Sequence, residues 1–230
     1  MEGSRGLGDV YKRQLRRLFQ QELGVSPQQV ALHRRLLFAK QLLHDTHLRV
    51  TDVALAAGFN SLRRFNDAFV HSYGMNPSEL RRKSAVERGE KEGICIYLPY
   101  RPPYDFQSLL GFLQARLIAG LEWVDVNVYH RVVPRQWLRN QKDGGQSLAW
   151  LSVADQSEKR RLQVHLYGVD AANLMPLIRQ LKCFFDTNAD SVPIEQHLAM
   201  STDLAKLVDR FPGIRVPGTL DGFELALRAI

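Results

Sequence analysis

Apolar residues recur at helical spacing in the first third of the chain and predict a run of helices there. They span about residues 27–44, 50–57 and 61–73. The apolar side chains of the first helix fall at i, i+4, i+7 and i+11 and share one face: Leu32, Leu36, Ala39 and Leu43. In the last helix, Phe65 and Phe69 are predicted to point into the core. We therefore expect a small helical domain.

An internal repeat underlies this pattern. A shift of 50 residues aligns three pairs of positions: Phe19 with Phe69, Gly24 with Gly74, and Pro27 with Pro77. The glycines suit the left-handed residue that ends a helix. Ser26 and Asn76 suit N-caps, and Gln29 and Glu79 complete a capping-box pattern three positions later. The same unit of helix, stop, cap and helix is therefore predicted twice.

The remaining sequence changes its period and predicts a mixed segment. Short apolar runs typical of strands occur at residues 94–98, 124–133, 148–154 and 161–169. Helical spacing returns at 104–117 and 171–185, then in two short helices within 193–211 and a last helix over 220–230. We expect a small antiparallel α+β domain followed by the start of a helical one.

The charge balance separates these two parts. The chain has 230 residues, with 31 Lys and Arg against 24 Asp and Glu, which gives a net charge of +7. Residues 1–92 hold 16 basic and 10 acidic side chains, whereas residues 93–230 hold 15 and 14. A basic helical module is typical of proteins that bind a polyanion. A hydrophobic content of 45% and a charged content of 24% exclude a mostly disordered chain, a collagen and a coiled coil.

The two predicted helices around Gly58 have the spacing of a helix-turn-helix unit. In such a unit a short turn containing Gly joins two helices, and the second helix enters the major groove of DNA. Ser61 is the predicted cap of this second helix, and Arg64 is expected to contact phosphate. Four side chains lie away from the apolar face: Leu62, Arg63, Asn66 and Asp67. Because Arg pairs well with guanine and Asn with adenine, this face is a candidate for reading base edges.

The same residues resemble a known family. The stretches VTDVALAAGFNSLRRFNDAF at 50–69 and YGMNPSELR at 73–81 resemble the second half of the AraC-type regulator domain. That family has two helix-turn-helix units joined by one long helix. The resemblance implies base-facing positions in both reading helices: Arg16 and Arg17 in the first, and Leu62, Arg63, Asn66 and Asp67 in the second. It also implies an incomplete first unit, since the opening helices of the family would precede Leu15.

Both ends of the sequence are unusual. Residues 1–14 show no helical or strand periodicity, and the run from Gly8 to Gln14 resembles a translated adaptor sequence. We therefore expect residues 1–14 to be a non-native leader. The last predicted helix reaches Ile230 without the usual stop signals, so we expect the sequence to end inside a helix of a larger domain.

The α+β segment carries a second resemblance. The stretch LPYRPPYDFQSLLGFL at 98–113 resembles the opening of AlkA-type methyladenine DNA glycosylases, and GIRVPGTLDGFELALRAI at 213–230 resembles the start of their catalytic helical domain. By this resemblance, Phe112 lines the pocket for the flipped base. Val216 lies in the loop that wedges an apolar side chain into the DNA stack, with Arg215 and Pro217 beside it. An apolar wedge suits a glycosylase because the gap left by an extruded base must be filled.

The sequence holds little other recognisable chemistry. It has no Walker loop, no Gly-x-Ser-x-Gly motif and no His-Glu-x-x-His motif. His44 and His47 have no third ligand nearby, so we expect no metal and no cofactor. By resemblance, the helix-hairpin-helix and the catalytic Asp of the glycosylases would follow Ile230. We therefore expect a full-length parent to excise alkylated bases, and this chain alone to release none.

Taken together, the patterns predict a chain of mixed fold with successive segments. They are a leader at 1–14, an all-α AraC-type double helix-turn-helix domain with an incomplete first unit at 15–83, a charged linker at 84–93, an α+β AlkA N-terminal domain at 94–186 and the start of a helical glycosylase domain at 187–230. We expect a monomer with double-stranded promoter DNA, alkylated DNA and RNA polymerase as partners. Two cysteines, no secretory signal and no apolar run long enough to span a membrane predict a cytoplasmic protein at the nucleoid.

Three functional hypotheses fit these features. In the first, a DNA-binding transcription regulator is fused to the front of a base-excision-repair glycosylase, an arrangement that occurs in the bacterial adaptive response to alkylation. In the second, an AraC-family regulator carries a non-catalytic α+β domain that senses a ligand. In the third, the basic module of a glycosylase holds DNA without sequence preference, which predicts equal affinity for promoter and random duplex.

Overall fold

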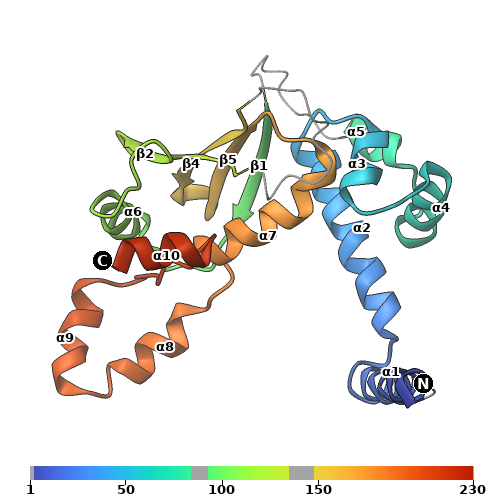
Figure 1. Cartoon of the computed structure of the whole chain (residues 1–230), viewed down its shortest axis with the longest axis horizontal. Helices are drawn as coiled ribbons and strands as arrows, with labels where there is room; N and C mark the ends of the chain where they lie inside the picture. Colours follow the sequence, from blue (N-terminus) through green and yellow to red (C-terminus); the bar gives the residue numbers. More distant parts are fainter. Residues whose placement is uncertain (1–2, 84–92, 135–147, 230) are drawn as a thin grey trace.

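The computed structural model describes residues 3–83, 93–134 and 148–229, in which a helical module precedes a sheet domain (Figure 1). The helical module contains α1 (Gly3–Leu23), α2 (Pro27–Asp45), α3 (Val50–Ala56), α4 (Leu62–Tyr73) and α5 (Pro77–Lys83). Helices α2, α3 and α4 lie where the apolar spacing placed them. The linker expected at 84–93 lies outside the described residues except for Gly93.

The core of the helical module contains most of the predicted apolar face. Leu36, Ala39 and Leu43 of α2 are buried together with Phe65 and Phe69 of α4. The rings of this core contact one another in sequence order, since Phe59, Phe65, Phe69 and Tyr73 follow each other with centroids about 5 Å apart. Leu32, in the first half of α2, is exposed instead. Figure 1 shows that the N-terminal part of α2 extends past α3 and α4 toward α1.

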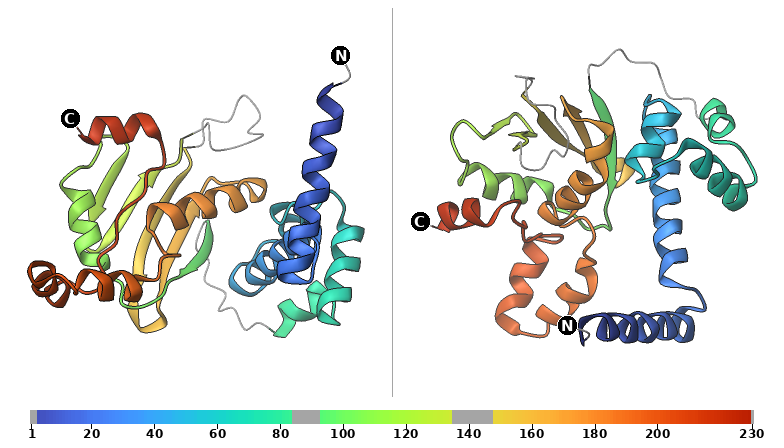
Figure 2. Two further views of the ribbon diagram at one scale, coloured as in Figure 1. Left: turned by 90° about the horizontal axis from the view of Figure 1, so that it is seen from below. Right: turned by 45° about the vertical axis from the view of Figure 1, so that its right-hand side comes forward.

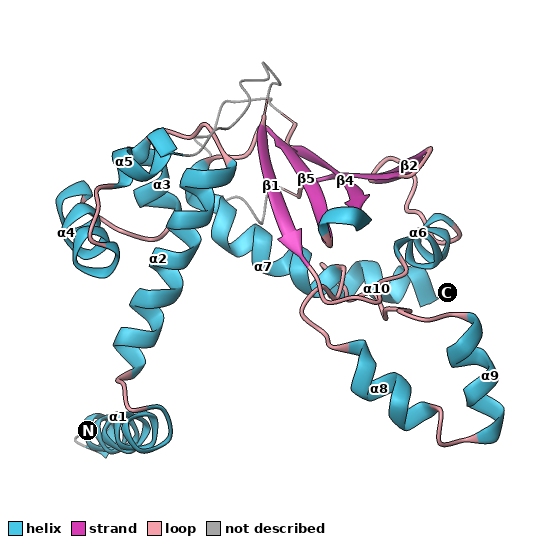
Figure 3. Cartoon of the chain, turned by 180° about the vertical axis from the view of Figure 1, so that it is seen from behind, coloured by secondary structure: helices cyan, strands magenta, loops and turns pink. Residues whose placement is uncertain are grey.

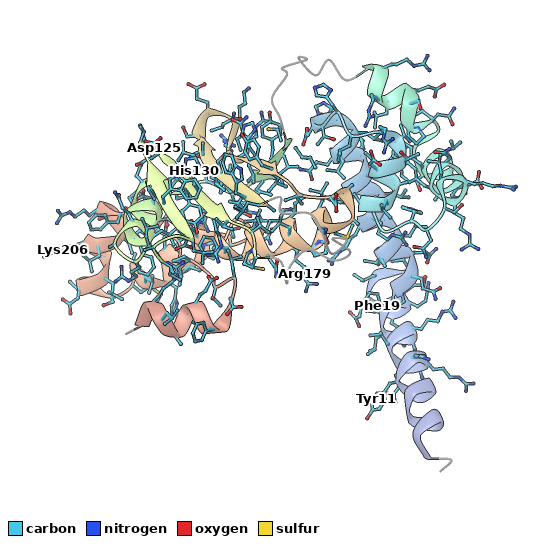
Figure 4. The ribbon with its side chains drawn as sticks, turned by 45° about the horizontal axis from the view of Figure 1, so that its top comes forward. Tyr11, Phe19, Asp125, His130, Arg179 and Lys206 are labelled. Atoms are coloured by element: carbon cyan, nitrogen blue, oxygen red, sulfur yellow. The ribbon has the colours of Figure 1, made fainter. Side chains whose placement is uncertain are left out.

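Helix α1 corrects the expectation for the start of the chain. Residues 3–14, predicted to lack regular structure, belong to one continuous helix that ends at Leu23. From Tyr11 to Leu23 none of its side chains is buried, and Figure 4 shows Tyr11 and Phe19 along a helix that extends away from the rest of the module. A helix that packs on so little needs no regular apolar face, which is why its period is weak in the sequence.

The predicted stop signals of the repeat are confirmed, as are the first capping box in full and the Glu79 half of the second. Gly24 and Gly74 both adopt left-handed conformations, with φ of 68° and 67°. Ser26 accepts a hydrogen bond from the backbone N–H of Gln29, whose side chain accepts one from the backbone N–H of Ser26, and this reciprocal pair forms a capping box. In the second copy, the Glu79 carboxylate accepts a hydrogen bond from the backbone N–H of residue 76 at 2.9 Å.

The sheet domain is built on an antiparallel sheet. Its described strands are β1 (Ile94–Pro99), β2 (Glu122–Asp125), β3 (Val128–Val132), β4 (Trp150–Gln156) and β5 (Arg161–Tyr167), in the order β1-β5-β4-β3-β2. The single strand predicted over 124–133 is a hairpin instead, because Val126 takes a positive φ of 54° between β2 and β3. A valine rarely adopts this conformation, so the turn carried no glycine signal in the sequence.

One face of the sheet is covered by helices and forms the second part of the core. Helices α6 (Phe106–Gln114), α7 (Leu174–Phe184) and α10 (Gly222–Ala229) lie on this side, and Figure 3 shows the opposite side with α7 behind the sheet. The inward strand positions are buried, and the ring of Tyr129 packs on those of Phe184 and Phe185. Alternate positions along each strand point to the other, outward face.

Two further helices project from the sheet domain (Figure 2). Helices α8 (Ser191–Leu198) and α9 (Thr202–Arg210) are the two short helices that the sequence predicted within 193–211. No residue of α9 is buried, although its apolar side chains form a clear face. Asp190 caps α8 by accepting a hydrogen bond from the backbone N–H of Val192 at 3.3 Å.

The helical module and the sheet domain pack against each other. Helix α3 contacts the short 3₁₀ helix η3 (Ala171–Asn173), and α2 lies along β1. The side-chain amide of Gln41 donates a hydrogen bond to the backbone carbonyl of Tyr97 at 2.8 Å. Since β1 is an edge strand of the sheet, this bond satisfies a carbonyl that has no neighbouring strand.

Candidate nucleic-acid interface

Helices α3 and α4 form the predicted helix-turn-helix unit. The turn between them contains Gly58 at φ 77°, and Ser61 caps α4 by accepting a hydrogen bond from the backbone N–H of Arg64 at 3.4 Å. Phe65 and Phe69 anchor α4 in the core of the module. The first turns of α4 are therefore held in a fixed orientation at the surface.

The polar face of α4 is open to solvent. The side chain of Arg63 is 91% exposed, and its Nε lies 4.0 Å from a carboxylate oxygen of Asp67, one turn along the helix. An ion pair this exposed contributes little to stability, so both groups are available to a ligand. Leu62 and Arg64 are also exposed.

Asn66 is less exposed than the other predicted base-facing residues of the same helix. Its side chain is half-buried, and its Oδ1 atom is buried without a hydrogen-bond partner in the described structure. The structure therefore brings Leu62, Arg63 and Asp67 to one open surface, with Asn66 at its margin.

Arg35 of α2 fixes the turn of this unit, a role that sequence reasoning missed. Its Nε donates a hydrogen bond to the carbonyl of Ala57 at 2.7 Å, and its guanidinium also donates to the carbonyl of Gly58. The guanidinium lies 4.0 Å from the ring centroid of Phe59. The carbonyls at the end of a helix favour a cation, so Arg35 joins the long helix to the turn of the reading unit.

Helix α1, which the resemblance predicts to be the first reading helix, has a different environment. Arg16 and Arg17 are exposed on α1, as are the neighbouring apolar residues Leu15 and Leu18. Phe19, which the repeat aligns with the buried Phe69, is only half-buried. The described structure therefore shows these two arginines on a helix that little else supports.

The segment that precedes α10 exposes Ile214 and, to a greater extent, Val216. Val216 is 79% exposed, whereas its neighbour Arg215 is 5% exposed. The guanidinium of Arg215 donates hydrogen bonds to the carbonyls of Ala189, Arg101 and Pro103 at 3.0, 2.8 and 2.9 Å. Arg215 lies beside Val216 as the resemblance implied, but its guanidinium is directed at backbone carbonyls, and Pro217 is half-buried.

Two glycines fasten the same segment on either side of Val216. Gly213 donates its N–H to the Glu195 carboxylate at 2.7 Å and accepts a hydrogen bond from the backbone N–H of Asp105 at 2.8 Å. A Cβ atom at Gly213 would lie 2.6 Å from backbone atoms of residues 103 and 104. Gly218 donates to the carbonyl of Phe184 at 2.9 Å, and a Cβ there would lie 2.5 Å from the carbonyl oxygen of Cys183. Val216 is thus presented by a segment that is bound at both ends.

Phe112 lies on the outer side of α6 and not in the core. The buried residues of α6 are Phe106, Leu109, Leu110 and Leu113. Phe112 is exposed, and the guanidinium of Arg116 lies 4.1 Å from its ring centroid. The ring therefore has an open surface, which a residue that lines a binding pocket requires and a core residue does not have.

A buried ionic cluster holds α10 on the sheet, and no sequence pattern indicated it. The fully buried Arg131 of β3 donates to Glu122 of β2 and to Glu224 of α10, the latter at 2.6 Å. Arg228 of α10 also donates to Glu122, and the hydroxyl of Tyr129 donates to the same carboxylate at 2.5 Å. Burial raises the pKa of the Tyr129 hydroxyl, so it remains a hydrogen-bond donor. Removing one partner from such a cluster leaves an uncompensated buried charge.

Other types of site are not seen in the described residues. His44 and His47 belong to no group of three metal-ligating side chains there. None of the helices in that part of the chain has the length and apolar character needed to cross a membrane. A shallow cavity of about 310 Å³ lies on the helical module, not inside the sheet domain, and is lined by Leu37, Lys40, Gln41, His44, Asp45 and Leu80.

Comparison with family models agrees with this division. Residues 9–83 match a helix-turn-helix domain, and the match begins within the segment that was expected to be a leader. Residues 95–221 match the AlkA N-terminal domain, which covers more than half of the chain.

Comparison with individual proteins gives the same two parts. A probable bifunctional transcriptional activator/DNA repair enzyme AlkA from Mycobacterium tuberculosis is 31% identical over 222 residues, which are 95% of this chain and 42% of that protein. The chain thus spans about two fifths of the length of this relative. The HTH-type transcriptional regulator GbdR of Pseudomonas aeruginosa is 38% identical over 74 residues, 32% of this chain and 20% of that protein.

A solved structure is also similar. It is a transcriptional regulator with an AraC-type DNA-binding domain from Chromobacterium violaceum, 38% identical, with a TM-score of 0.31, covering 34% of this chain and 68% of that one. The chain belongs to the AlkA N-terminal domain family, and in it an AraC-type helix-turn-helix DNA-binding domain precedes that domain.

Proposed function

We propose that α4 reads a specific promoter sequence in duplex DNA. The observation that carries this proposal is the open face of α4, where Leu62, Arg63 and Asp67 project from a helix anchored by buried aromatic rings. Arg63 has the reach and the donor pattern for guanine in the major groove. A contact between this module and RNA polymerase remains a prediction.

Replacement of Arg63 tests sequence reading. Duplexes selected by the chain from a random pool serve as the specific ligand, and an unselected duplex of equal length serves as the reference. Arg63→Ala is expected to reduce the preference for selected over unselected duplex by about 1–3 kcal/mol, because it removes a base contact. Arg64→Ala, on the adjacent exposed arginine, is the matched control and should weaken both duplexes alike.

The outcome also decides between the hypotheses. If Arg63→Ala lowers the affinity for both duplexes by the same factor, the module holds DNA through phosphate contacts alone and the proposal for α4 is wrong. The proposal is equally wrong if the chain selects no sequence from the pool.

We further propose that the sheet domain and the segment before α10 serve the repair of alkylated DNA in a longer protein. The relative from Mycobacterium tuberculosis is named as a DNA repair enzyme, and the display of Val216 between two fastened glycines supports a wedge that enters the base stack. The exposed ring of Phe112 supports a place in the pocket for an extruded base. No residue of this chain is assigned to the cleavage of the glycosidic bond.

Fluorescence of 2-aminopurine in duplex DNA tests the wedge, because this base brightens when it loses its stacking. Binding of the chain beside an abasic site is expected to raise the emission, and Val216→Ala should abolish most of the rise. Val126→Ala is the matched control, since Val126 is an 88% exposed valine in the β2–β3 turn. An equal rise for Val216→Ala and the original chain would contradict the wedge.

A further inference from the structure

The outward face of the sheet carries a row of aromatic rings that crosses four strands. Trp123, His130, Trp150 and Tyr167 come from β2, β3, β4 and β5 in that order. Their strand positions alternate with the buried ones, so they point away from α6, α7 and α10. Figure 4 shows His130 and Asp125 close together on this side of the sheet.

The rings form two stacked pairs that meet in the middle. Trp123 lies parallel to His130, with centroids 4.9 Å apart and planes 3° apart. Trp150 lies parallel to Tyr167, at 3.9 Å and 10°. The pairs approach each other at 6.1 Å between His130 and Trp150. Burial lowers the pKa of His130, which favours the uncharged ring within this stack.

One end of the row is open. Trp123 is 42% exposed and stands on β2, an edge strand of the sheet. His130 stacks on one face of its indole, and the ring of Trp150 approaches it at a centroid distance of 6.2 Å with the planes tilted by 36°. Aromatic pairs across strands stabilise a sheet by a few tenths of a kcal/mol to about 1 kcal/mol. That effect accounts for the paired rings but does not require a large indole face to remain in water at the end of the row.

The charge of the same face suits a nucleic-acid strand. Among the outward positions of the described strands, Asp125 is the one carboxylate, while Arg161 and two histidines supply cationic or donor groups. The guanidinium of Arg161 lies 3.5 Å from the ring centroid of Tyr97, another outward aromatic residue. The adjacent turn adds the exposed cations Lys159 and Arg160 beside one exposed carboxylate, Glu158, so its net charge is positive. Aromatic rings bordered by cations are the usual means of binding unpaired bases and their phosphates.

We propose that the outward face of the sheet binds single-stranded DNA, with an unpaired base stacked on Trp123 and the phosphates directed toward Arg161 and the neighbouring turn. DNA is the favoured strand because the same chain carries a helix-turn-helix DNA-binding domain on α3 and α4, packed against this domain. This site is separate from α4 and from Val216, and it would act on DNA whose strands have been opened.

Binding of oligothymidylate to the whole chain tests the proposal, because this probe forms no duplex for α4 to read. A fluorescently labelled strand of about 15 nucleotides suits a site of this size. Trp123→Ala is expected to weaken binding about tenfold, which corresponds to one lost stacking contact. Trp123→Tyr keeps a stacking surface and should retain affinity within about threefold. Arg161→Ala should also weaken binding and reduce its dependence on salt.

Two controls make the result specific. Phe223→Ala removes an aromatic ring of α10 that is 73% exposed outside the sheet, and Arg63→Ala removes a cation of the reading helix. Neither should change the affinity for oligothymidylate. Equal affinities for Trp123→Ala and Phe223→Ala would overturn the proposal, as would failure of the original chain to bind the probe. Tighter binding of oligouridylate than of oligothymidylate would also overturn it, because the preferred strand would then be RNA.

Discussion

Helices α1 and α4 are two copies of one sequence unit in two different environments. Each ends at a glycine in the left-handed conformation, and each leads through a capping pattern into the next helix. Phe69 of α4 is fully buried, whereas Phe19, its counterpart in α1, is half-buried among exposed neighbours. Local signals therefore set where both helices end, while burial depends on the elements packed around them.

The comparison also separates what makes a helix from what makes a reading helix. Helix α4 rests on α3, and Arg35 fixes the turn between them. Helix α1 touches α2 at one end and turns away from it (Figure 2). Arginines on both helices can attract phosphate. The arginines on α4, however, stand on a helix whose position relative to α3 is fixed.

The largest expected difference between the two copies concerns their aligned phenylalanines. Phe69→Ala should lower the free energy of unfolding of the helical module by about 3–5 kcal/mol, because it leaves a cavity in the core. Phe19→Ala should change it by less than about 0.5 kcal/mol, as expected for a residue outside a packed core. Urea unfolding followed by circular dichroism measures both values. Similar losses for the two variants would show that α1 is packed as firmly as α4.

A smaller effect is expected from the arginine that supports α4 alone. Arg35→Ala should lower the free energy of unfolding of the helical module by about 2–3 kcal/mol, because a charged donor to the carbonyls of Ala57 and Gly58 is lost. Arg34→Ala is the matched control, because Arg34 is the exposed neighbour on the same helix and should cost at most a few tenths of a kcal/mol. Hydrogen exchange of the backbone amides in α3 and α4 should rise in the first variant only. If hydrogen exchange in α3 and α4 is unchanged in Arg35→Ala, Arg35 does not support the turn.

The smallest effect concerns the two glycines that end the copies. No atom lies within 4 Å of a Cβ built at Gly24 or Gly74, so alanine at either position meets only the backbone cost of a positive φ. Gly74→Ala should lower the free energy of unfolding by about 1–2 kcal/mol. Gly24→Ala should leave the main unfolding transition unchanged, because α1 can fray without disturbing the core. If thermal unfolding shows the same loss of stability for Gly24→Ala and Gly74→Ala, α1 and the core unfold together.

The sequence predicted the elements whose signals are local. The spacing of Leu36, Ala39 and Leu43 and the caps at Ser26 and Ser61 placed the helices of the module correctly. The β2–β3 hairpin was hidden because Val126 occupies a turn position that favours glycine or asparagine. Helix α1 was hidden because it packs on little and needs no apolar face.

The parts of the candidate interface that depend on distant contacts could not be predicted. Arg215 and Val216 are adjacent in sequence, yet one is bound to three backbone carbonyls and the other faces solvent. Arg131 and Glu224 meet from positions 93 residues apart, so no spacing rule brings them together. The outward aromatic row is likewise a property of strand register, which the sequence pattern left open.

The hydrogen bond from Gln41 to Tyr97 has a consequence for solubility. An edge strand with unpaired carbonyls is a template on which another chain can add a strand, and proteins protect such edges by covering them. Helix α2 provides this cover for β1. We therefore expect the sheet domain released from its helical module to expose that edge and to self-associate, and α2 to keep the joined chain in solution.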